Sequence, residues 1–273
     1  MNLTKLIPFL LCSLLPIGCD SRTSTTTPIK IEQPATKAQK QIIVETVKLY
    51  DHIYKLSFKE LRVVEHPNPT SRTLGDGRIE TVLASGKPGK IEITLRTYSP
   101  TDANLLRDTL KHELFHTILP NQMADLFPTR RILGDGSECL GFHGLTMKVR
   151  TTSGVETYFR AIEEAAAELC AQQLGPGFVS TAPDYFSISI FMKEMTNMEW
   201  VTPEELIAFQ KSNGFREFCA KILKTEARSL SDDDIRLVCE AFQLVRGSRT
   251  EIVPQLKKII ERRGETGKYQ FRE

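Results

Sequence analysis

The stretch Lys111-His112-Glu113-Leu114-Phe115-His116-Thr117 contains the pattern His-Glu-x-x-His. Leucines recur around it at helical spacing and Pro120 follows them, so the sequence predicts a helix from about 101 to 119. On a helix, positions i and i+4 lie one turn apart on the same face, so the imidazoles of His112 and His116 can share one metal ion. The stretch therefore predicts a metal site on a helix.

Glu113 stands next to the first of these histidines. In this pattern the glutamate of zinc peptidases acts as the general base that takes a proton from water. A catalytic zinc usually has three protein ligands, so two histidines are not enough. The longer motif with a third histidine is absent, because Leu119 and Gln122 stand where it needs Gly and His.

A second predicted helix, from about 158 to 174, contains Glu163-Glu164-Ala165-Ala166-Ala167-Glu168. Together with the His-Glu-x-x-His helix it resembles the gluzincin peptidases, in which a second helix supplies a glutamate as third ligand. The resemblance covers residues 90–175 and implies Zn2+ on His112, His116 and Glu164. It also implies Glu168 as the acceptor for a histidine N–H, which would fix that ring. Glu163 is the alternative third ligand.

The resemblance implies a reaction in which zinc-activated water attacks a peptide bond and Glu113 is the general base. The oxyanion that forms needs a further donor. His143, Tyr158 and Tyr185 are the candidates, and His143 is preferred because Gly141 and Gly144 would let its loop approach the site.

The N-terminus predicts export. A short basic head precedes an apolar run from Leu6 to Gly18, which fits a signal-peptide core and is short for a bilayer span. The run ends at Pro16-Ile17-Gly18-Cys19, which resembles the lipobox of bacterial lipoproteins. The resemblance implies lipidation of Cys19 and a membrane-anchored protein of the cell envelope that faces the periplasm or the exterior. An ordinary secreted protein is the alternative.

Four cysteines follow Cys19, and an even number in an oxidising compartment allows two disulfides. The pairs Cys139–Cys170 and Cys219–Cys239 are one possible arrangement. Four small buried thiols are an equally good interpretation.

The remaining pattern predicts an α+β fold. Apolar spacing predicts an amphipathic helix over 38–56 and strands over 59–65, 79–84 and 91–98, the last with one buried and one wet face. Gly and Pro predict a turn at 85–89, and 120–157 looks irregular except for a possible hairpin over 145–158. Further helices are expected after Pro183, Thr202 and Ser231, and from 254 to 263.

These elements predict a zincin-like core, made of a small twisted sheet, the His-Glu-x-x-His helix and the glutamate-bearing helix, with a mainly helical C-terminal lobe. The expected domain organisation is a signal peptide at 1–18, a flexible tether at 19–37, a catalytic domain at 38–200 and a helical subdomain at 201–273. The strand before the metal helix is expected to offer a free edge to an extended peptide.

The function predicted is that of a zinc metallopeptidase acting on a peptide or protein. A net charge of +2 argues against a nucleic-acid partner. Two alternatives stay open: a non-catalytic envelope lipoprotein that retains a zincin fold, and a metallohydrolase acting on something other than peptides.

Overall fold

The computed structural model describes residues 28–56, 60–66, 70–73, 79–82, 84–95, 98, 103–131, 134–175, 183–245 and 249–269 of the 273. The predicted signal peptide, Cys19 and the first part of the predicted tether lie outside these residues. No helix in the described part of the chain is long and apolar enough to cross a membrane.

Helices and strands are both abundant, so the predicted α+β class is confirmed. The α-helices are α1 Lys37–Tyr54, α2 Ala103–Thr117, α3 Ala161–Gln173, α4 Pro183–Asn197, α5 Pro203–Ser212, α6 Phe215–Leu223, α7 Asp232–Leu244 and α8 Ile252–Arg262. The strands are β1 Ile29–Ile31, β2 Leu61–Val64, β3 Thr70–Thr73, β4 Ile79–Val82, β5 Ala84–Lys87, β6 Lys90–Ile93, β7 Ala124–Arg131, β8 Glu138–His143, β9 Thr146–Arg150 and β10 Glu156–Phe159.

The first sheet has the strand order β1-β2-β6-β5. β1, β2 and β6 are parallel, and Ile29 and Ile31 of β1 stand opposite Leu61 and Val63 of β2. The prediction of a flexible tether over 19–37 was therefore wrong for 29–31. These isoleucines pack against the core, and that burial draws the segment into the sheet.

β5 corrects two further predictions. The segment 85–89 was expected to be a turn, but Ala84–Lys87 pairs antiparallel with β6 and only the next two residues turn. β6 lies between β2 and β5, so the strand before the metal helix is internal and β5 is the edge strand. Gly86 gives the segment a turn-like composition, but it is buried where β5 packs on α2.

The wet face predicted for 91–98 was also wrong within the described residues. Ile91 and Ile93 are fully buried as expected, yet Glu92 is only 5% exposed. Its carboxylate pairs with Lys87 and Lys90 at 2.8 and 2.7 Å. Burial raises the pKa of Glu92, but these ammonium groups outweigh it and lower the pKa to about 2.

A second sheet, with the order β10-β9-β8-β7, occupies most of the segment 120–157 that was expected to be irregular. The predicted hairpin is confirmed as β9 and β10, which pair antiparallel. The sequence pattern did not predict β8, because Gly141 interrupts the alternation of apolar and polar residues. The pairing of β8 with β9 is irregular at the same place, since its register shifts between Cys139 and Gly141. Helices past Pro183, Thr202 and Ser231 are confirmed.

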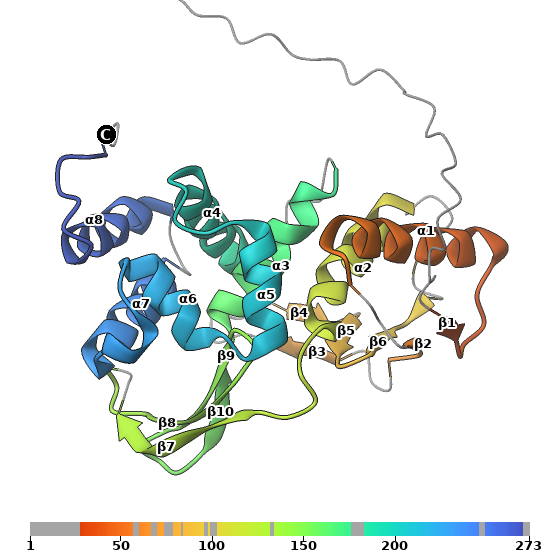
Figure 1. Ribbon diagram of the computed structural model, residues 1–273. Helices are drawn as coiled ribbons and strands as arrows, with labels where there is room; N and C mark the ends of the chain where they lie inside the picture. The colour runs from red at the N-terminus through yellow and green to blue at the C-terminus, as the bar shows by residue number, and fades with distance from the viewer. Residues whose placement is uncertain are drawn as a thin grey trace, which may run out of the picture.

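Figure 1 shows the first sheet with α1 and α2 on one side of the molecule and the second sheet with α4 and α6 to α8 on the other. α3 lies between them and packs against both α2 and α4. One hydrophobic core cluster includes residues of both parts. Cys139, Cys170, Cys219 and Cys239 are all free and buried, so the interpretation as buried thiols is the one observed.

Candidate metal centre

α2 buries one face, and both histidines lie at the edge of that face. Of the leucines expected to form the apolar face, Leu106, Leu110 and Leu114 are at most 1% exposed. Leu105 was expected there too, but it is 38% exposed and lies outside the buried face. Phe115, fully buried, meets the ring of His116 edge to face at a centroid distance of 6.1 Å. The histidines are thus held on a helix that is fixed by its packing.

α3 brings its carboxylates to the same place. Glu163 and Glu164 lie in its first turn, where the unpaired N–H groups and the helix dipole favour negative charge. Both are buried, and so is Glu168 one turn further along. Because α3 packs directly on α2, these three carboxylates face the two histidines.

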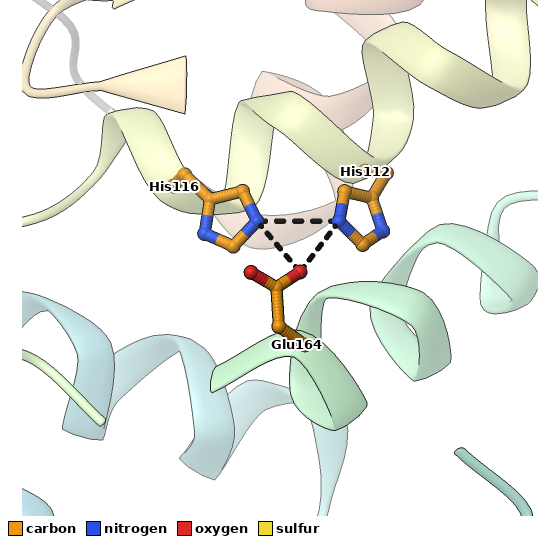
Figure 2. Close-up of side chains that lie close together, drawn as sticks. All are labelled: His112, His116 and Glu164. Carbon is orange, nitrogen blue, oxygen red and sulfur yellow. Dashed lines mark hydrogen bonds and ion pairs between the residues drawn. The ribbon is translucent and has the colours of Figure 1, made fainter. Parts of the chain in front are cut away.

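Three donor atoms converge between the two helices (Figure 2). The Nε2 atoms of His112 and His116 are 3.2 Å apart. Glu164 Oε2 lies 3.1 Å from the first nitrogen and 3.5 Å from the second. A buried His112, His116 and Glu164 group of this kind could hold a metal ion.

The distances fit a tetrahedral ion. With metal–ligand bonds of about 2.0–2.1 Å, donors at the corners of a tetrahedron lie about 3.3–3.4 Å apart. The three observed separations, 3.1, 3.2 and 3.5 Å, lie on either side of that value. Two ring nitrogens and one carboxylate oxygen around a single point form the donor set that Zn2+ prefers, and three protein ligands leave a fourth position for water.

The outer nitrogen of each histidine also faces a carboxylate. His112 Nδ1 lies 3.3 Å from Glu168 Oε2, and His116 Nδ1 lies 2.8 Å from Glu163 Oε1. Glu163 thus faces the side of His116 away from the converging donors, and Glu164 faces the donors themselves. Carboxylates at the outer nitrogen of a ligating histidine fix its ring orientation and tautomer.

The charges at the site favour a cation. Burial lowers the pKa of His112, but hydrogen bonds to Glu164 and Glu168 outweigh burial and raise the pKa to about 9. Burial opposes the charged form of His116 too, yet the charges of Glu163 and Glu164 raise its pKa well above the usual value. Conversely, burial raises the pKa of both glutamates, whereas His116 lowers that of Glu163 to about 2 and that of Glu164 well below its normal range. A divalent cation that replaced the imidazole protons would neutralise the same carboxylates.

Access to the centre is uneven. The side chains of His112 and Glu164 are 19% and 11% exposed, but that of His116 is 4% exposed. Glu113 is half-buried on the same helix, and no described residue donates a hydrogen bond to its carboxylate.

The three candidate oxyanion donors lie in different settings. His143, at the end of β8, donates from Nε2 to the Pro120 carbonyl at 2.6 Å, which ties its ring to the segment after α2. Tyr158 lies on β10 and is 51% exposed. The side chain of Tyr185 is outside the part of the chain that the structure describes. His143 is not one of the three residues of the convergent group.

Sequence reasoning missed three residues around Glu163. The Thr146 hydroxyl donates to Glu163 Oε2, Gln210 Nε2 donates to Glu163 Oε1 at 2.9 Å, and Arg160 Nε lies 3.4 Å from Glu163 Oε2. Only Arg160 could have been found from the sequence, because it stands one helical turn before Glu164.

Compared with known proteins, the chain matches no family model, no curated protein and no solved structure.

Proposed function

We propose that this protein is a zinc-dependent peptidase of the gluzincin type, with a zincin-like core. His112, His116 and Glu164 would hold the metal, with Glu168 and Glu163 behind the two histidines. The observation that carries the proposal is the convergence of two Nε2 atoms and one carboxylate oxygen at distances of 3.1 to 3.5 Å. Glu113 on the same helix supplies the base that such a hydrolase needs.

Zinc bound there would lower the pKa of water toward neutrality and polarise the carbonyl of the substrate. The Glu113 carboxylate would accept a proton from the attacking water and deliver it to the leaving amine. Glu164 and the carboxylates behind the histidines would keep the ligands aligned. We keep His143 as the proposed oxyanion donor, a role that requires it to exchange the Pro120 carbonyl for the substrate.

The edge strand β5 favours a peptide as substrate. It is the last strand of its sheet, with β6 on one side, and it packs directly on α2. An extended peptide can add to such an edge through main-chain hydrogen bonds. A peptide paired with β5 would therefore run alongside the helix that carries Glu113 and both histidines.

Replacing Glu113 with Gln tests the proposal. Glu113 is not among the converging donors, so the variant should still bind one zinc, while hydrolysis of a peptide library should fall by about 100-fold or more because the base is lost. Glu217→Gln, on the exposed face of α6, is the matched control and should keep full activity. Unchanged hydrolysis in Glu113→Gln would contradict the assignment. Zinc binding by the wild type without chelator-sensitive cleavage would favour the non-catalytic alternative.

We also propose that the protein is exported and anchored through Cys19. The support is the apolar run up to Gly18 and the lipobox-like residues before the cysteine. Incorporation of a labelled fatty acid by the wild type but not by Cys19→Ser would test it, and equal labelling of both would refute it.

A further inference from the structure

Gln210 is a buried polar side chain that links the C-terminal helices to the metal centre. It lies on α5 and is 0% exposed. Its Oε1 accepts a hydrogen bond from the backbone N–H of Leu145, 2.8 Å away, in the turn between β8 and β9. Its Nε2 donates at 2.9 Å to Glu163 Oε1, the oxygen that lies 2.8 Å from His116 Nδ1. A single side chain thus connects a backbone turn to the carboxylate behind a candidate ligand.

The direction of these hydrogen bonds is fixed at one end. A backbone N–H can only donate, so the carbonyl oxygen of the Gln210 amide must face Leu145 and its NH2 group must face Glu163. Thr146 donates its hydroxyl to the other oxygen of Glu163. Arg160, whose Nε lies 3.4 Å from that same oxygen, can also only donate. Glu163 is surrounded by donors, so it serves as an acceptor.

The same logic places the hydrogen of His116. If Glu163 accepts, the hydrogen between the two residues belongs to His116 Nδ1. A neutral imidazole with its hydrogen on Nδ1 keeps a lone pair on Nε2. Nε2 is the atom that faces His112 and Glu164. When a metal takes the place of the second imidazole proton, the chain of hydrogen bonds therefore keeps the remaining hydrogen on Nδ1 and leaves Nε2 to bind the metal.

The turn that starts this chain is itself held in place. Gly144 has φ +60 and donates its N–H to Asn213 Oδ1 at 2.8 Å. A Cβ at Gly144 would lie 2.5 Å from Leu119 Cδ2 and would also collide with the Gln210 amide. Asn213, the C-cap of α5, in turn donates to the carbonyl of Gln122. The Leu145 N–H thus has little freedom to turn away from Gln210.

We propose that Gln210 is a positioning residue of the metal centre. Acting through Glu163, it sets the tautomer and orientation of His116 that present Nε2 to the metal. This inference rests on the proposed function, since it requires a metal at His112, His116 and Glu164. A weaker counterpart exists behind the other histidine, where half-buried Gln172 donates to Glu168 at 3.2 Å.

The test uses the full-length chain and Gln210→Glu, which keeps the acceptor for Leu145 but replaces the donor to Glu163 with a second acceptor. Gln210→Met removes the donor and has a side chain of similar volume. It is the second test variant, used if Gln210→Glu does not fold. Zinc affinity, measured by competition with a chromophoric chelator, should fall by about 10–100-fold, as for other residues behind metal ligands. Gln255→Glu is the matched control, a buried glutamine of α8, and should bind zinc like the wild type.

A spectroscopic readout separates positioning from general stability. Long-range 1H–15N spectra of the zinc-loaded wild type should show the hydrogen of His116 on Nδ1, in slow exchange with water. The signal should broaden or disappear in the Gln210 variants and persist in Gln255→Glu. Zinc bound through Nδ1 of His116 in the wild type would overturn the inference without any variant. Wild-type zinc affinity and an unchanged spectrum in the Gln210 variants would also overturn the inference. A wild type that binds no zinc would instead refute the proposed function itself.

Discussion

Glu163 and Glu164 are adjacent on α3 but face opposite sides of His116. Glu164 Oε2 lies among the converging Nε2 atoms, whereas Glu163 reaches only the outer nitrogen. We predict that Glu164→Gln lowers zinc affinity by more than about 100-fold, because it removes a charged ligand. Glu163→Gln should lower it by about 10–100-fold, because it removes a partner of a ligand. Chelator competition on both variants measures the ranking, and the reverse order would make Glu163 the ligand.

The sequence identifies part of this centre and leaves the rest open for a physical reason. His112 and His116 follow from spacing alone, because i and i+4 share a helix face. Glu163 and Glu164 cannot be ranked in this way, since consecutive helical residues point about 100° apart and the pattern does not show how α3 is rotated against α2. Gln210 is 47 residues from Glu163, and no local pattern encodes such a contact.

At the scale of elements, β5 and α2 approach closely only because residue 86 is glycine. A Cβ there would lie 2.6 Å from the Cβ of His116 and would collide with the Glu113 carbonyl oxygen. The turn after β5 is fastened to the same helix, because Gly89 N–H donates to the Thr117 carbonyl at 3.0 Å. The edge strand is therefore joined to α2 by a close approach and by a backbone hydrogen bond.

We predict that Gly86→Ala destabilises the protein by about 1–3 kcal/mol, as overpacking commonly does, and also weakens zinc binding by moving His116. Denaturant unfolding and chelator competition measure the two effects. Gly134→Ala is the control, since its Cβ would meet only the end of the Glu240 side chain, which can move aside. Wild-type stability in Gly86→Ala would show that β5 does not need this close approach.

Two strands, β5 and β8, were not predicted because their composition is typical of turns. Ser85-Gly86-Lys87-Pro88-Gly89 has the residues of a turn, yet its first three belong to β5 because pairing with β6 and packing on α2 override local preference. β8 contains Gly141, which faces β7 at a tight point, where a Cβ would lie 3.0 Å from the Ala124 carbonyl oxygen and from Met123 Cε. The helices were predicted more closely, because their apolar spacing and capping residues are local signals.

At the scale of the whole molecule, the centre joins the two parts of the fold. The histidines come from α2, which packs with α1 and the first sheet, and the carboxylates come from α3, which packs with α4, α5 and α7. Gln210 adds a contribution from α5, beyond the predicted domain boundary at residue 200, a boundary that stays a prediction. A metal held by His112, His116 and Glu164 would therefore cross-link elements from both parts.

This arrangement predicts that removing the metal weakens the whole fold. A ligand bound only by the folded state stabilises it by about 2.7 kcal/mol at a free concentration 100 times its dissociation constant. For a chain of this size that corresponds to a Tm lower by about 5–10 °C after chelation. Differential scanning calorimetry measures the shift, and hydrogen exchange should show protection lost in α2 and α3 together. His112→Ala should melt at the same temperature with and without chelator, because it has already lost a ligand. Equal melting temperatures for the wild type in both conditions would show that no metal joins the two helices.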